Sequence, residues 1–250
     1  MPRELAQTNL QLYDEVAPLG WSETDLVRLR DGYDLVCELF SGMVRPTGKT
    51  FVAHLVGTAS ALVRIGERPA VVLAGLLHAA YTLGEFGDGT RGESEPKRRV
   101  VTAAVGPEAE WLVSRYTRLR WAPEVVSGLL ERATDLDAEA RDVVVMRLAN
   151  EVDEWVDGGH RYAPAAATNM QSSLDALVSL AERVGLPELG RELRALDASA
   201  NAAEVPVVLV GVNRGGSHAI PPRSHRPRLT LRARRQLGRR RRQILAFFRR

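Results

Sequence analysis

Two histidines, His54 and His78, stand inside two apolar segments that a short Gly/Pro turn separates. Apolar residues recur at three- and four-residue spacing in both segments, so each is predicted to be a helix. The first helix is expected over about 50–65, and the second opens at Pro69 and carries His78. If the two stripes pack together, both imidazoles enter one pocket, where they could ligate a divalent metal or bind a substrate. The alternative is a buried pair that hydrogen-bonds internally, to Asn150 or to the backbone.

The neighbours of this pair suit an anionic ligand. Arg45 and Lys49 precede the first helix and could hold a phosphate or a base at the pocket mouth; alternatively they are ordinary solvated charges. Tyr81 could stack or hydrogen-bond, and Asn150 comes from a third helix that is apolar on two sides. Seven residues are therefore predicted to line the pocket: Arg45, Lys49, His54, Thr58, His78, Tyr81 and Asn150.

The rest of the body also has helical spacing, which predicts an all-α bundle. No stretch alternates as strands between hairpin turns do. Proline in first turns and glycine at helix ends mark the boundaries. Further helices are expected over about 22–41, 107–119, 137–157, 164–184 and 187–196. One more helix is expected to end near residue 106, and another to begin at residue 123. The Gly- and charge-rich stretch 84–96 is predicted to be a mobile loop and a candidate lid.

Charge divides the chain into an acidic body and a basic tail. Residues 205–250 contain thirteen arginines and no lysine, aspartate or glutamate. The first 204 residues contain the other 21 basic side chains and all 31 acidic ones, so the body has a net charge of −10 and the tail one of +13. The tail is predicted to be largely disordered, and residues 223–250 could contact nucleic acid unspecifically or an anionic membrane surface. The alternative is a solvated tail that folds back on the acidic body.

Composition indicates a soluble protein. At 250 residues with 45% apolar side chains, the chain can bury a core, and its apolar runs fall far short of the ~20 residues of a transmembrane segment. The N-terminal stretch has no signal-peptide apolar core, which predicts a cytoplasmic location. Cys37 is the only cysteine, so an intrachain disulfide is excluded.

Three segments carry a resemblance to a known family: RPTGKTFVAH, ending at His54; AGLLHA, containing His78; and RLAN, ending at Asn150. They resemble the HD-domain superfamily of metal-dependent phosphohydrolases, and within it the hydrolase domain of RelA/SpoT-type alarmone enzymes. The combination of HLVGTAS and LLHAAY also resembles uncharacterised bacterial proteins related to HD domains. The resemblance implies an HD-like helical domain over 1–200, with its core at about 22–157, followed by an Arg-rich linker and tail over 201–250.

The departures from this family fall on its acidic residues. Ala79 stands where the family has the aspartate of its His-Asp doublet, and Asn150 where it has the last ligand aspartate. Thr82 and Leu83 stand where the alarmone hydrolases have an acidic pair. A divalent ion prefers anionic ligands, so the family's hydrolysis is not expected and no residue is predicted to be catalytic.

A divalent metal stays open as a cofactor. The metal ligands would be His54 and His78, with Glu151 as a third. Four acids could replace the missing ones: Glu85, Asp88, Glu151 and Asp153.

Three functions follow from these patterns. The first is a domain with a degenerate metal site that binds a small anionic or nucleotide-like ligand or acts in regulation. The second is a divergent metal-dependent phosphohydrolase on a nucleotide-like substrate, using relocated acids. The third is an adaptor that acts through its basic tail.

Overall fold

The computed structural model describes residues 5–156, 158–162, 174–202, 205–210 and 218–220. The chain divides into two compact units, Met1–His218 and Ala219–Arg250. Of the second unit only Ala219 and Ile220 are described, and both are exposed. The basic tail expected over 223–250 therefore lies outside the described residues, and the domain boundary after residue 200 stays a prediction.

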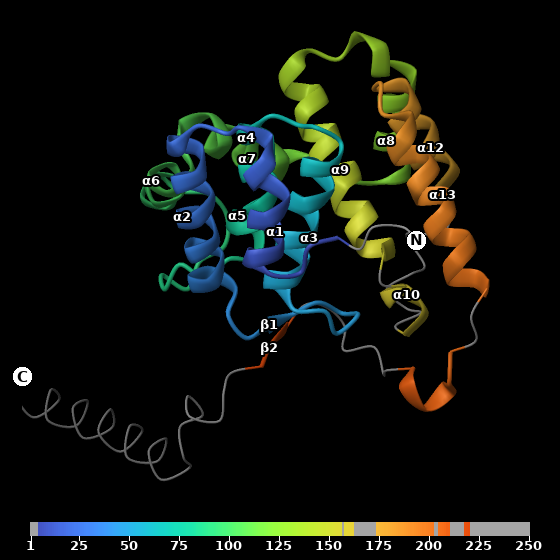
Figure 1. Cartoon of the computed structure of the whole chain (residues 1–250), viewed down its shortest axis with the longest axis horizontal. Coiled ribbons are helices and arrows are strands. Elements are labelled where there is room, and N and C mark those ends of the chain that lie inside the picture. Colours follow the sequence, from blue (N-terminus) through green and yellow to red (C-terminus); the bar gives the residue numbers. More distant parts are fainter. Residues whose placement is uncertain (1–4, 157, 163–173, 203–204, 211–217, 221–250) are drawn as a thin grey trace, which may run out of the picture. The chain divides into compact units, whose positions relative to one another are not determined.

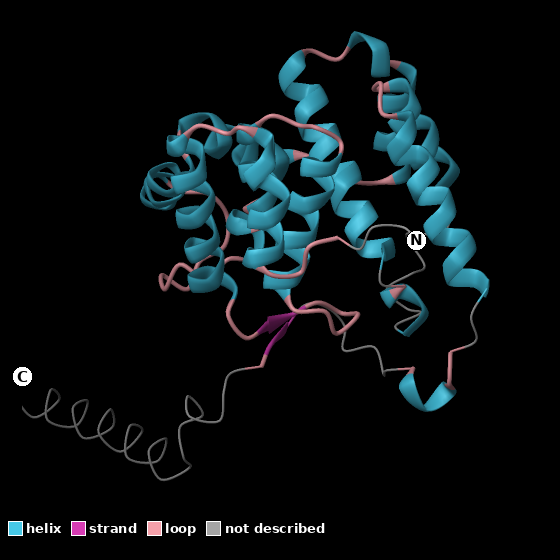
Figure 2. Ribbon diagram, in the orientation of Figure 1, coloured by secondary structure: helices cyan, strands magenta, loops and turns pink. Residues whose placement is uncertain are grey.

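The first unit is built of helices, which confirms the all-α prediction (Figures 1 and 2). The strands β1 (Met43–Val44) and β2 (His218–Ala219) have two residues each. The helical elements are α1 (Asn9–Val16), η1 (Ala17–Leu19), α2 (Glu23–Phe40), α3 (Phe51–Arg64), α4 (Pro69–Leu76), α5 (Ala80–Leu83), α6 (Glu95–Val105), α7 (Pro107–Arg118), α8 (Pro123–Glu131), η2 (Ala133–Asp135), α9 (Ala138–Val156), α10 (Gly159–Tyr162), α12 (Leu174–Arg183), α13 (Pro187–Ala202) and η4 (Val207–Leu209).

Helix starts follow from local sequence. The Thr50 hydroxyl accepts from the backbone N–H of Ala53 at the start of α3, and Ser22 does the same for Asp25 at the start of α2. Proline in the first turn opens α4, α7 and α8, where its missing N–H costs no helical hydrogen bond. The expected starts of these helices are thus correct to within about a residue.

Helix α3 lies at the centre of the bundle. It packs against α9 and α4, and also contacts α1 and α2 (Figure 1). Residues 54–63 of α3 are all buried, which requires a helix that is apolar or small on every side. Among the later helices, α12 packs on α13 and on α8. The two helices that carry the site, α3 and α9, therefore belong to the core.

The second histidine-bearing helix is shorter than predicted. Helix α4 ends at Leu76 and α5 begins at Ala80, so His78 lies in the turn between them. The Nδ1–H of His78 donates to the Gly75 carbonyl at 2.8 Å, and backbone bonds three residues apart replace the helical pattern here. The prediction of one continuous helix was wrong because it ignored this competition between side chain and backbone.

The stretch 84–96 is tied to the body. Glu85 N–H donates to the Leu39 carbonyl at 3.0 Å, Gly92 N–H donates to the Tyr81 carbonyl at 2.9 Å, and Lys97 donates to the Thr90 carbonyl at 2.8 Å. These contacts lend no support to a mobile lid. Of the helix expected over 164–184, the structure describes the part from Leu174 on.

Within the described residues, no helix combines the length and the apolar character needed to cross a membrane.

Candidate functional site

Helices α3 and α9 meet at His54 and Asp153. The Nδ1–H of His54 donates to Asp153 Oδ2 at 2.7 Å, and the ammonium group of Lys49 donates to Asp153 Oδ1 at the same distance. The side chain of Asp153 is fully buried and that of Lys49 is 10% exposed. Gly57 makes room for this carboxylate, because a Cβ at Gly57 would lie 1.8 Å from Asp153 Oδ1. A charged group is thus held at a close helix contact that only glycine permits.

Arg45 joins the other side of the His54 ring to α9. Its Nη1 donates to His54 Nε2, and its Nη2 donates to the carboxylate of Glu154. The amide nitrogen of Asn150 donates to the same Glu154 oxygen at 3.2 Å. A tight turn places Arg45, since its N–H donates to the Lys49 carbonyl at 2.8 Å. The guanidinium therefore lies between an imidazole nitrogen and a carboxylate.

The second histidine lies beside the first. The ring centroids of His54 and His78 are 5.2 Å apart, and their planes are nearly perpendicular. Tyr116 covers His78 from α7, with ring centroids 5.0 Å apart. Because Nδ1 of His78 donates to Gly75, its Nε2 is the acceptor, and this atom has no hydrogen-bond partner among the described residues.

Arg147 and the buried Glu151 form another ion pair next to this cluster. Arg147 Nη2 donates to Glu151, and Nη1 donates to the Tyr116 hydroxyl at 3.3 Å. The guanidinium also lies 5.0 Å from the Trp121 ring centre. Among the described residues the cluster contains three cations, Arg45, Lys49 and Arg147, and three carboxylates, Glu151, Asp153 and Glu154.

Burial keeps both imidazoles neutral. It lowers the pKa of His54 well below 6.5, with Arg45 acting in the same direction, and it lowers that of His78 well below 6.5, helped by His54. Burial also acts to raise the pKa of Glu154, but Arg45 and other positive neighbours outweigh it, so the pKa of Glu154 is lowered. For Asp153 burial prevails over Lys49 and raises the pKa. Each histidine thus has one protonated and one unprotonated nitrogen.

These histidines predict a loss of stability in mild acid. Below about pH 6.5, His54 and His78 take up protons in the unfolded chain but stay neutral in the folded protein. The free energy of unfolding therefore decreases as the pH is lowered, by up to about 1.4 kcal/mol per pH unit for each histidine. We expect His78→Gln to remove its share of this slope in urea unfolding measured from pH 7.5 to 5.5. Asp153 and Glu151 have raised pKa values, so they make the folded protein more stable as the pH is lowered further. The test is therefore the difference between the pH slopes of the free energy of unfolding of the variant and the wild type. Equal slopes for both proteins would contradict the assignment.

The structure brings five of the seven predicted pocket residues into one network: Arg45, Lys49, His54, His78 and Asn150. Thr58 is buried nearby, but its hydroxyl donates to the carbonyl of His54 on its own helix at 3.0 Å. Tyr81 belongs to a different cluster, where it donates to Glu110 at 2.7 Å while Arg98 binds the same carboxylate.

Three of the four acids that the sequence suggested as replacements have partners outside the histidine network. Glu85 accepts from the Gly87 N–H, Asp88 pairs with Lys97, and Glu151 faces Arg147. Asp153, one of the four candidates, does contact His54, and Glu154 was missed. Glu154 follows Asn150 by one helical turn, so its spacing was the available signal.

The arrangement does not fit a bound metal ion. Across the described ranges no group of three or more histidine, cysteine, aspartate or glutamate side chains is arranged to hold one. Arg45 covers Nε2 of His54, and Asp153 takes its Nδ1. Glu151, the proposed third ligand, is bonded to Arg147.

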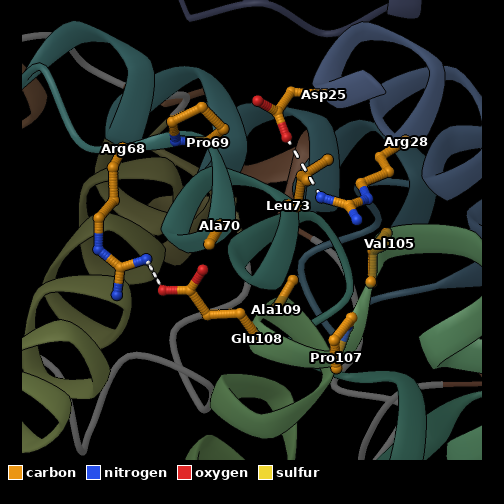
Figure 3. A pocket seen from close by; sticks show the side chains of 11 residues that line it. Asp25, Arg28, Arg68, Pro69, Ala70, Leu73, Val105, Pro107, Glu108 and Ala109 are labelled. Carbon is orange, nitrogen blue, oxygen red and sulfur yellow. Dashed lines mark hydrogen bonds and ion pairs between the residues drawn. The ribbon is translucent and has the colours of Figure 1, made fainter. Parts of the chain in front are cut away.

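Two surface pockets are lined by other residues. The pocket in Figure 3 has a volume of about 370 Å³ and lies at the starts of α4 and α7, where Arg28 pairs with Asp25 and Arg68 with Glu108. A second pocket of about 440 Å³ lies among α7, α8 and the start of α9. Neither includes His54 or His78.

Comparison with known proteins adds one similarity. No curated protein matches the chain. Residues 35–120 match the model of a domain of unknown function, DUF6817. The match runs from within α2 to the end of α7 and includes Arg45, His54 and His78, but not Asp153 or Glu154.

Proposed function

We propose that this chain is an HD-like binding module that takes a small anionic or nucleotide-like ligand at Arg45 and Lys49 without a metal ion. The observation that carries the proposal is that one loop supplies two cations, each anchored by a carboxylate of α9 and each still in contact with solvent. Their side chains remain 18% and 10% exposed. A guanidinium has five N–H donors, and the bonds of Arg45 to His54 and Glu154 use one on Nη1 and one on Nη2, so Arg45 can still donate to a phosphate oxygen.

Anchoring supports binding because it removes part of its entropic cost. Free arginine and lysine side chains lose rotamer freedom when they close on a ligand, whereas Arg45 and Lys49 are already held by Glu154 and Asp153. A bound anion would share these cations with the carboxylates that already hold them. In the described part of the chain each carboxylate of the network is paired with a cation, which favours binding and a regulatory role over hydrolysis, and we propose a cytoplasmic location.

The test is binding in the presence of EDTA. We expect phosphate, pyrophosphate or a guanine or adenine nucleotide to raise the melting temperature and to bind in calorimetry, and the unphosphorylated nucleoside to bind at least tenfold more weakly. Arg45→Lys keeps the charge but loses the planar fork, and we expect it to weaken binding about tenfold. The control is Arg30→Lys, at the exposed Arg30–Asp31 pair. Failure of every phosphate compound to bind, or equal binding by Arg45→Lys, would reject the proposal.

A divergent phosphohydrolase is the second candidate, and it draws support from Asp153 and Glu154 in the histidine network. Its test is a nucleotide panel with added manganese, together with elemental analysis of protein purified without chelator. The absence of both turnover and stoichiometric metal would exclude it. The adaptor function of residues 223–250 rests on sequence, and removal of residues 205–250 should abolish salt-sensitive binding to DNA or anionic vesicles if it holds.

A further inference from the structure

His54 and His78 each have one ring nitrogen fixed by a hydrogen bond. In each ring Nδ1–H donates to a fixed acceptor, Asp153 Oδ2 for His54 and the Gly75 carbonyl for His78, both within 2.8 Å. This leaves an Nε2 lone pair on each ring, and the rings lie 5.2 Å apart. A carboxylate or carbonyl on one ring nitrogen is the usual device that directs the other nitrogen of a histidine toward a cation.

An anionic oxygen accompanies these lone pairs. Glu154 comes from α9, its side chain is 17% exposed, and Arg45 and Asn150 both donate to its Oε1. Arg45 therefore touches one imidazole lone pair and one carboxylate at the same time. The lone pair of His78 Nε2 has no partner among the described residues.

We propose that the Arg45 guanidinium is a built-in cation that takes the place of a divalent ion between His54 Nε2 and Glu154, and so keeps this site free of metal. The two occupants exclude each other, because Arg45 uses the same lone pair and the same oxygen that an ion would need. Removing the guanidinium frees His54 Nε2 and the Glu154 carboxylate, which are ligand types that Zn²⁺ accepts. No three histidine, cysteine, aspartate or glutamate side chains of the described residues are already arranged around an ion, so these two must move together to bind one. The inference deepens the proposed function at the same site, since it names Arg45 as the cation that replaces a metal.

The experiment is zinc binding by full-length wild type, Arg45→Met and Arg45→Lys, each stripped with EDTA and dialysed. We expect Arg45→Met to bind one additional equivalent of Zn²⁺ at least tenfold more tightly than any site of the wild type, and Arg45→Lys to resemble the wild type. The extra equivalent should disappear in Arg45→Met combined with His54→Ala, and also when combined with Glu154→Gln. Cobalt substitution should give the visible absorption of a low-coordinate site only in Arg45→Met.

Each outcome of these measurements either supports or overturns the inference about Arg45. A folded Arg45→Met protein that gains no metal overturns the inference, and so does a wild type that already binds one equivalent through His54. If Arg45→Met does not fold without metal, Zn²⁺ added during refolding from urea should restore a cooperative unfolding transition. A variant that stays unfolded with Zn²⁺ also overturns the inference. None of these results depends on whether the wild type binds phosphate in EDTA, so the proposed function can fail separately.

Discussion

Replacing Gly57 by alanine is expected to lower the free energy of unfolding by about 3 kcal/mol or more. The new methyl group would lie 1.8 Å from Asp153 Oδ1 and 2.7 Å from its Cγ. Asp153 cannot move away freely, since it is fully buried and holds both His54 and Lys49. Either α3 and α9 separate or the carboxylate loses its partners. Urea unfolding at pH 7 measures the loss.

A matched control comes from Gly128, in the interior of α8. A Cβ there meets nothing within 4 Å, so Gly128→Ala tests the helical preference of alanine alone. It should leave stability unchanged or raise it by up to about 1 kcal/mol. The pair of variants therefore separates the clash at Asp153 from the general effect of adding a methyl group to a helix.

A double-mutant cycle localises the effect. In an Asp153→Ala background the clash is absent, so adding Gly57→Ala should cost far less than it does in the wild type. Equal costs in the two backgrounds, or a wild-type-like Gly57→Ala protein, would mean that α3 and α9 do not meet at this carboxylate.

The histidine pair could be predicted because its signals are local. The spacing of apolar residues around His54, Gly66 and Pro69 marks the helices, and both histidines fall on buried positions. The break of the helix at His78 could not be predicted in this way. It depends on the choice of Nδ1 to donate to the Gly75 carbonyl, which the periodicity does not encode.

Glu154 was missed for a different reason. A comparison with the HD pattern asks what stands at two motif positions, and the answers are Ala79 and Asn150. Asp153 and Glu154 stand three and four residues after Asn150, so the helix turns them toward the same region. Asp153 was already a candidate acid, and the spacing of one helical turn from Asn150 was the signal for Glu154.

The pairing of Arg45 needed the tertiary structure. Its loop position suggested a solvent-facing anion contact, and its chain neighbours give no sign of Glu154, which lies more than a hundred residues away. Only the packing of α3 on α9 brings the two groups together. Long-range ion pairs of this kind have no sequence period that could reveal them.

Replacing Lys49 by methionine should cost about 3–5 kcal/mol of the free energy of unfolding at pH 7, because it leaves Asp153 buried without its cation. Asp153 already has a raised pKa, and loss of Lys49 should raise it further, so the folded variant binds a proton more readily than the unfolded chain does. The deficit of Lys49→Met relative to wild type should therefore shrink as the pH falls toward 5.

Adding Asp153→Asn to Lys49→Met removes the buried charge while its oxygen still accepts from His54, so most of the stability should return. The surface control is Arg30→Met, at a pair whose side chains are 60% and 40% exposed, where no measurable change is expected. Urea unfolding at two pH values measures all four proteins. A deficit that stays constant with pH, or that the double variant does not relieve, would show that Lys49 acts through packing and that its charge on Asp153 contributes little.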